Sequence, residues 1–156
     1  MVYFKNTLLF LLLNFAALGI GSILMGGEVT GEWYQQLNKA PWTPPGYVFG
    51  LAWSSIMICF SFFLARLISL TPETERKSFW IVFGIQWLLN VLWNPLFFYL
   101  HLPTTALIEI LLLLAVVGYY VIIGIQKTHY NVLLVLPYFL WMIIATSLNA
   151  YVVWAN

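Results

Sequence analysis

Five long apolar runs constrain this chain more than any other feature of its sequence. They cover residues 6–25, 46–68, 78–99, 104–125 and 131–154, separated by short polar or proline-rich stretches. A bilayer core is about 30 Å thick, and a helix rising about 1.5 Å per residue crosses it in about 20 residues. Because backbone amides cannot stay unpaired in lipid, each run is expected to be a helix. The sequence predicts one all-α domain over residues 1–156, an integral membrane bundle of five transmembrane helices.

Composition agrees with a lipid environment and excludes several other classes of protein. The 156 residues are 63% hydrophobic and 7% charged, whereas soluble domains carry about 25% charged residues. A net charge of +1 offers no basic surface, so no nucleic-acid partner is expected. The single Cys59 cannot form an internal disulfide. No metal-binding, phosphate-binding or hydrolase motif is present, so we expect no metal, no cofactor and no conventional catalytic site.

The basic residues predict how the chain sits in the membrane. Five of the six fall on the side that holds the N-terminus, namely Lys5, Arg66, Arg76, Lys77 and Lys127, while Lys39 alone lies on the other. Loops rich in Lys and Arg stay in the cytoplasm. We therefore expect a cytoplasmic N-terminus in a bacterial-type membrane, with the long loop 26–45 outside.

Polar and aromatic side chains within the spans follow helical stripes. In the third span the stripe is Gln86, Asn90, Trp93 and Phe97, and in the fifth it is Tyr138, Trp141, Ala145 and Asn149. Amides at membrane depth are costly unless paired. Both stripes should therefore face other helices or a cavity. Trp87 and Trp141 lie deep in their spans, where lipid offers no partner for an indole N–H, so both should turn inward.

Three candidate pocket residues lie at overlapping depths in the membrane, below the long loop. They are Trp53, Asn90 and Trp141. Ala145 is small enough to leave room beside them. This arrangement predicts a pocket for a flat apolar ligand, with Asn90 supplying a hydrogen bond. The alternative is ordinary helix packing, in which amides act as polar glue between helices.

A proline-rich segment, "KAPWTPPGYVFGLAW" (residues 39–53), leads into the second span. Prolines limit the freedom of a loop, so less entropy is lost when it closes over a ligand. We interpret residues 26–45 as a lid, with Trp42 as its interfacial anchor. The lid residues expected to matter are Trp33, Pro41, Trp42, Pro44 and Pro45.

Glu109 stands near the outer end of the fourth span. A carboxylate there could carry protons, or it could be hydrated or paired because the edge of the membrane is close. We expect the Glu109 carboxylate to be hydrated or paired and not to carry protons. The function of Glu109 stays open.

Three blocks carry a family resemblance: "WYQQLNKAPWTPPGYVFGLAW" (33–53), "QWLLNVLWNPLFF" (86–98) and "PYFLWMIIATSLNAYVVWAN" (137–156). Together on five spans they resemble the translocator protein family, also called the tryptophan-rich sensory protein or peripheral-type benzodiazepine receptor family (TspO/MBR). The resemblance covers nearly the whole chain in order. It implies a five-helix bundle that is often a homodimer.

The resemblance also implies a pocket under the first loop for porphyrins such as protoporphyrin IX, benzodiazepine-type drugs and, in animal members, cholesterol. On matching positions the pocket residues are Tyr34, Trp53, Asn90, Trp141 and Ala145. With the stripes, the full expected set adds Gln86, Trp93, Tyr138 and Asn149. In some bacterial members the tryptophans matching Trp53 and Trp141 support light-dependent porphyrin breakdown, and these two would be the catalytic residues if that activity applies.

One departure separates this chain from animal members of the family. Their cholesterol motif ends the fifth span with a tyrosine followed by a basic residue. Here Ala150 stands where the tyrosine would be, and no basic residue follows Tyr151. We therefore do not expect cholesterol to bind tightly. We expect the protein to lie in a prokaryotic cell membrane, with the mitochondrial outer membrane as the alternative.

The expected function is a membrane binding protein for porphyrin-like or tetrapyrrole-like ligands, acting in their transport, sensing or homeostasis. The first alternative is photo-oxidative porphyrin degradation, and the second is a regulatory membrane interaction protein.

Overall fold

The computed structural model describes residues 2–156 and contains five long helices. These are α1 (Val2–Leu24), α3 (Gly46–Leu70), α4 (Arg76–Asn94), α5 (Pro103–Lys127) and α6 (Leu136–Ala155). With their flanking turns, all five are long and apolar enough to cross a membrane. Within the described residues there is no β-strand. The predicted all-α membrane bundle is confirmed.

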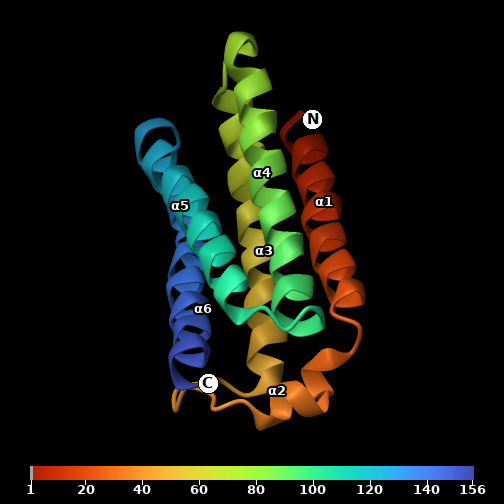
Figure 1. Cartoon of the computed structure of the whole chain (residues 1–156). Helices are drawn as coiled ribbons and strands as arrows, with labels where there is room; N and C mark the ends of the chain where they lie inside the picture. The colour runs from red at the N-terminus through yellow and green to blue at the C-terminus, as the bar shows by residue number, and fades with distance from the viewer. Residues whose placement is uncertain (1) are drawn as a thin grey trace.

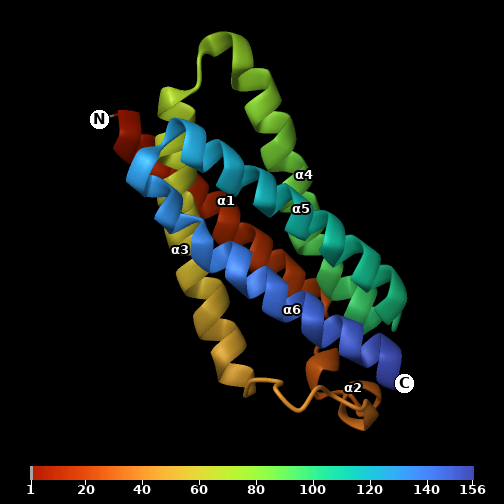
Figure 2. The same cartoon turned by 90° about the vertical axis from the view of Figure 1, so that its left-hand side faces the viewer.

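The helices form a closed ring around one core. Helix α1 contacts α3 and α4, α4 contacts α5, α5 contacts α6, and α6 returns to α3. Figure 1 shows α1 on one side and the α5–α6 pair on the other, and Figure 2 shows the α5–α6 pair from its outer side. The C-terminus lies beside the lid (residues 26–45), and the N-terminus lies near the opposite end.

Short helical turns connect the long helices. They are η1 (Glu28–Thr30) and α2 (Glu32–Gln36) in the lid, η2 (Glu73–Glu75), the π-helical turn η3 (Pro95–Tyr99) and the 3-10 turn η4 (His129–Leu134). Residues 26–45 were expected to be a loop, but they contain two helical turns, η1 and α2.

Prolines set two of these boundaries. Pro95 has no N–H to continue the α-helical ladder, and at this point α4 gives way to η3, which closes with a bond from Leu100 N to Pro95 O of 2.8 Å. The fifth span was expected to be helical from residue 131, but η4 occupies 129–134 and α6 begins at Leu136. Pro137 therefore lies in the first turn of α6, where its missing N–H is harmless.

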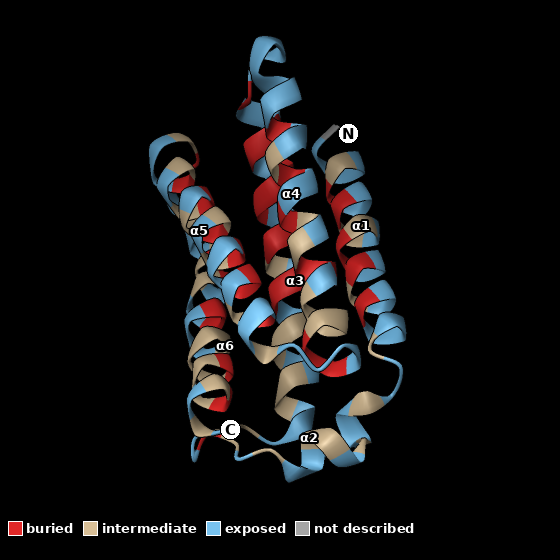
Figure 3. Cartoon of the chain, in the orientation of Figure 1, coloured by how far each residue is buried: buried red, intermediate tan, exposed pale blue. Residues whose placement is uncertain are grey.

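The core is aromatic and runs along the inner faces of all five helices. Phe60 and Phe63 of α3 pack with Tyr120 of α5, and Phe60 also meets Tyr138 of α6 edge to face at 5.1 Å. Figure 3 shows the buried residues along the inner faces and exposed residues along the outer faces. The exposed outer faces are rich in Leu and Ile, as expected of surfaces that contact acyl chains.

Two polar contacts fasten α1 to its neighbours. Asn14 Nδ2 donates to Ser61 Oγ of α3 at 2.9 Å. Trp87 Nε1 of α4 donates to the carbonyl oxygen of Leu13 at 2.8 Å. The expectation that the Trp87 indole turns into the bundle is confirmed. Both bonds satisfy polar groups at a depth where lipid supplies none.

Candidate ligand site

The Tyr138 hydroxyl is the centre of the polar contacts inside the bundle. It accepts hydrogen bonds from Gln86 Nε2 at 3.0 Å and from Asn90 Nδ2 at 2.7 Å. Gln86 and Asn90 are one turn apart on α4, so both amides reach the same oxygen on α6. All three side chains are buried. The two stripes expected from the sequence therefore meet, and the Tyr138 oxygen is one of the atoms that join them.

One indole, Trp53, packs against this polar group, and a second, Trp141, follows Tyr138 by about one turn on α6. The ring of Trp53 on α3 meets Tyr138 edge to face at 5.9 Å. The ring of Trp141 on α6 meets Phe49 of α3 at 5.5 Å and 81°. Trp141 is buried, and its Nε1 has no hydrogen-bond partner among the residues that the structure describes. An indole donor of this kind can bind an acceptor atom brought by a ligand or a water molecule.

A second polar pair lies nearer the lid. Trp93 Nε1 donates to Asn149 Oδ1 at 3.1 Å, and Asn149 Nδ2 donates to the carbonyl oxygen of Pro103 at 2.9 Å. This chain of bonds joins α4, α6 and the start of α5. Trp93 also stacks on Phe97 of η3 at 5.0 Å. Both polar side chains are committed to partners inside the protein, so we assign them to holding the three elements together.

Ala145 belongs to the α6 stripe, and Thr146 follows it in the chain. Ala145 is half-buried and packs against the core. The Thr146 hydroxyl is buried and has no partner within residues 2–156. Gln86 Oε1 shares this property. The Thr146 hydroxyl, the Gln86 carbonyl oxygen and the Trp141 N–H are thus unpaired donors and acceptors inside the bundle.

Helix α2 places Tyr34 against η3, the turn that follows α4. Its ring meets Phe98 at 5.1 Å and Phe97 at 6.3 Å, both edge to face. The Lys39 ammonium lies 4.3 Å from the centre of the same ring, on its face. Burial raises the pKa of the Tyr34 phenol above its usual 10.0. At neutral pH this side chain is therefore an uncharged hydrogen-bonding group.

The lid tryptophans have different surroundings. Trp33 stacks on His101 at 4.2 Å and meets Phe97 edge to face, so it packs on η3 and the turn that follows it. Trp42 is exposed, and its Nε1 donates to Ser147 Oγ of α6 at 3.2 Å. The prolines Pro41, Pro44 and Pro45 lie in the run from α2 to α3, with Pro41 in a turn closed by a bond from Thr43 N to Ala40 O. Trp42 therefore fixes this run to α6.

Asparagines tie the lid to the C-terminus. The Asn38 backbone N–H donates to Asn156 Oδ1 at 2.9 Å, and Asn38 Nδ2 donates to the carbonyl oxygen of Ala155 at 3.1 Å. Asn156 Nδ2 returns a bond to the carbonyl oxygen of Asn38 at 3.3 Å. Sequence reasoning missed this contact, because nothing in a loop Asn or a terminal Asn marks them as partners.

Glu109 contradicts the expectation that it would be hydrated or paired. Its side chain is buried on the inner face of α5, and neither carboxyl oxygen has a hydrogen-bond partner within the described part of the chain. The expectation from the sequence rested on the distance of Glu109 from the end of the helix. It did not consider the direction of the side chain, which decides exposure.

A sequence model of the TspO/MBR family matches residues 9–155. The chain belongs to the TspO/MBR family. It is an integral membrane protein of that family, and the expectation drawn from the three sequence blocks is confirmed.

Relatives within the TspO/MBR family include bacterial, archaeal and animal proteins. Protein CrtK of Rhodobacter capsulatus is 36% identical over 121 residues, which are 76% of this chain and 75% of that protein. The tryptophan-rich sensory protein of Cereibacter sphaeroides is 33% identical over 118 residues, 76% of this chain and 73% of that protein. The translocator protein of Homo sapiens is 28% identical over 140 residues, 88% of this chain and 81% of that protein.

For this TspO/MBR chain, sequence reasoning missed one aromatic contact of the candidate site. Phe49 lies one helical turn before Trp53 and supplies the ring against Trp141. The spacing of four residues could have indicated that Phe49 and Trp53 share a face of α3. Phenylalanine is so common in this sequence that the spacing alone did not single it out.

Proposed function

We propose that the protein binds flat, hydrophobic ligands of the porphyrin or tetrapyrrole class, protoporphyrin IX and benzodiazepine-type drugs among them. It would act in their transport, sensing or homeostasis. One observation carries the proposal: a buried polar group centred on the Tyr138 hydroxyl of α6 lies against the indole of Trp53, and Trp141 follows Tyr138 by about one turn on the same helix. The names of the relatives, a tryptophan-rich sensory protein and a translocator protein, support it.

The chemistry of the site suits such a ligand. Indole rings offer flat faces for stacking, and the unpaired Trp141 Nε1 and Thr146 hydroxyl offer hydrogen bonds to ring substituents. Trp53 and Tyr138 touch one another in the structure. Entry of a ligand therefore requires these side chains or the lid to move, which gives residues 26–45 a role in admission.

Quenching of tryptophan fluorescence by protoporphyrin IX in detergent tests this proposal. We expect saturable binding, weakened about tenfold in Trp141→Ala because stacking area and a hydrogen bond are lost. Trp141→Phe keeps an aromatic ring and removes the indole N–H. Its affinity for protoporphyrin IX should therefore lie between that of the unchanged protein and that of Trp141→Ala. Trp154→Ala is the matched control, since Trp154 is on the same helix and is 81% exposed. Equal affinity in all four proteins would contradict the site.

Illumination separates binding from the photochemical alternative. After saturation with protoporphyrin IX and exposure to light, binding alone leaves the porphyrin chemically intact, as extraction and mass spectrometry would show. Loss of porphyrin that depends on Trp53 and Trp141 would instead assign the degradation activity to this chain. The homodimer that the resemblance implies stays a prediction, which the mass of the purified protein in detergent tests.

A further inference from the structure

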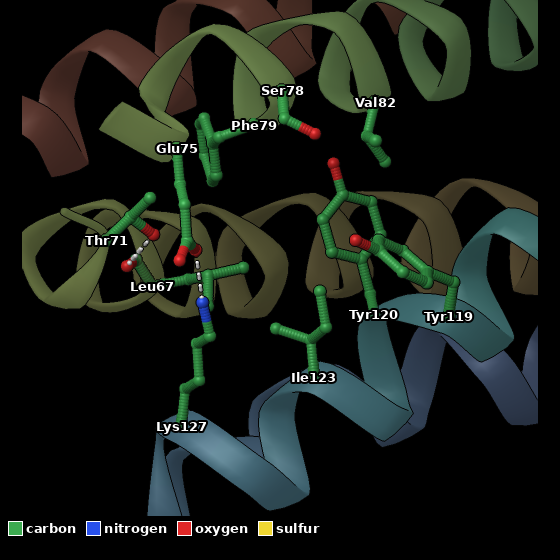
Figure 4. Close-up of a pocket in the computed structure, with 10 residues that line it drawn as sticks. All are labelled: Leu67, Thr71, Glu75, Ser78, Phe79, Val82, Tyr119, Tyr120, Ile123 and Lys127. Carbon is green, nitrogen blue, oxygen red and sulfur yellow. Dashed lines mark hydrogen bonds and ion pairs between the residues drawn. The ribbon is translucent and has the colours of Figure 1, made fainter. Parts of the chain in front are cut away.

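A hollow of about 200 Å³ lies at the end of the bundle opposite the lid, outside the candidate ligand site. It is bounded by the end of α3, by η2 and the start of α4, and by the last turns of α5 (Figure 4). Its inner walls include Leu67, Phe79 and Ile123, and polar side chains stand at its rim. None of its lining residues belongs to the stripes that meet at Tyr138.

An ion pair spans the rim of this hollow. Lys127 Nζ of α5 lies 2.6 Å from Glu75 Oε2 of η2. Both side chains are partly exposed, and Figure 4 shows the two reaching toward each other from different elements. The rim therefore already holds one carboxylate against one ammonium group.

The interior of the hollow contains an unpaired phenol. Tyr120 is 1% exposed, and its hydroxyl has no hydrogen-bond partner within residues 2–156. Figure 4 shows its side chain extending from α5 into the hollow, toward α4. A buried phenol without a partner is costly, and it prefers to donate to an oxygen atom.

A second hollow of about 300 Å³ continues the first along α4 and α5. The two share Val82 and Tyr119 as lining residues, so they are adjoining parts of one groove. The remaining walls of the second hollow are the apolar side chains of Ile85, Ala115 and Val116. Val116 is near the middle of α5, whereas Lys127 ends that helix. The groove is thus polar at the end of the spans and apolar toward their middle.

We propose that this groove binds a long-chain monocarboxylate, that is, a fatty acid. Its carboxylate would take the Tyr120 hydroxyl as donor and Lys127 as counter-ion, and its chain would lie between α4 and α5. The order of polar and apolar walls matches an amphiphile standing in a membrane leaflet, with its head at the interface. A groove between two helices holds one chain, and a carboxylate is the group that Lys127 already binds.

Binding exchanges one ion pair for another. The ligand carboxylate replaces Glu75 at Lys127, and Glu75 turns to the water at the end of the helix. The exchange conserves the number of charge pairs, so the gain comes from the Tyr120 bond and from burying the chain against apolar walls. This site does not depend on the proposed porphyrin site, and either can be present without the other.

Photolabelling tests the groove. Hexadecanoate with a diazirine at the end of its chain is added to the purified protein, and labelled peptides are mapped by mass spectrometry. We expect saturable labelling on α4 and α5 around Ile85 and Val116. Tyr120→Phe should weaken it about tenfold, the effect of removing one hydrogen bond to a charged group. Ala115→Trp, at an exposed position, should abolish it by filling the groove.

The controls separate this site from lipid contact in general and from misfolding. Tyr130→Phe removes the hydroxyl of a tyrosine that is 88% exposed. The extent of photolabelling in this variant should equal that of the unchanged protein. The methyl ester of hexadecanoic acid should compete poorly, because it lacks the charge. Circular dichroism and thermal unfolding of each variant in detergent report folding. Labelling spread evenly over all lipid-facing helices, or unaffected by both groove variants, would overturn the proposal.

Discussion

Among single side chains, Tyr138 joins two buried amides of α4 to α6 through one oxygen atom. A phenol oxygen can accept two hydrogen bonds, and here the amide groups of Gln86 and Asn90 supply both. Since each amide presents its N–H to Tyr138, the Gln86 carbonyl oxygen is left without a partner in the described residues. The hydroxyl thus fixes how both amides are turned, and with them which atoms a ligand can reach.

Removing that hydroxyl tests its importance for the fold. Tyr138→Phe leaves two buried amide donors without an acceptor, so we expect the free energy of unfolding to fall by about 1–3 kcal/mol. Denaturation in detergent, followed by tryptophan fluorescence, measures it. Tyr130→Phe should change nothing, because Tyr130 is exposed. Adding Gln86→Leu to Tyr138→Phe should recover part of the loss. A Tyr138→Phe protein of unchanged stability would refute this account.

Residue-level prediction from the sequence succeeded where helical spacing decides the outcome. Gln86 and Asn90 fall four residues apart, which places them on one face whatever surrounds them. Spacing within a helix says nothing about the height of one helix against another. The meeting of both amides at one oxygen therefore required the structure, and so did the rotation of α5 that buries Glu109.

Between elements, the boundaries were predicted less well than the helices themselves. Proline excludes the middle of a regular helix but permits a first turn, a kink or a bulge. Pro137 lies in the first turn of α6, and Pro95 is the first residue of the π-helical turn η3. Gly124 shows a further limit, since a Cβ there would lie 2.9 Å from Val132 Cγ2. That close approach of η4 to α5 has no signal in the sequence.

The tie between Asn38 and Asn156 predicts how the lid moves. Asn38→Ala removes the side-chain bonds to the C-terminal residues, so the lid should open more often. Hydrogen exchange of residues 32–45 should then speed up several-fold, the effect of losing about 1 kcal/mol. Gln36→Ala is the matched control on the neighbouring helix α2, where the side chain is exposed. Exchange equal in both variants would show that Trp42 and the prolines hold the lid without this tie.

The whole molecule carries most of its basic residues at one end. Lys5, Arg66, Arg76, Lys77 and Lys127 belong to the ends of α1, α3, α4 and α5 that lie away from the lid. Only Lys39 is on the lid side. The proposed fatty-acid groove opens at the basic end, and the candidate porphyrin site lies toward the lid. The two proposed ligands would therefore meet the protein from opposite leaflets.

Orientation follows from this asymmetry and can be measured. Because basic loops stay in the cytoplasm, we expect the lid to face outward and the N-terminus inward. In a Cys59→Ala background, Gln36→Cys on α2 and Lys77→Cys on α4 each provide one exposed thiol. In bacterial spheroplasts, a membrane-impermeant maleimide should label the first directly and the second only after lysis. The reverse pattern would place the lid in the cytoplasm, and porphyrin would then have to enter the site from inside the cell.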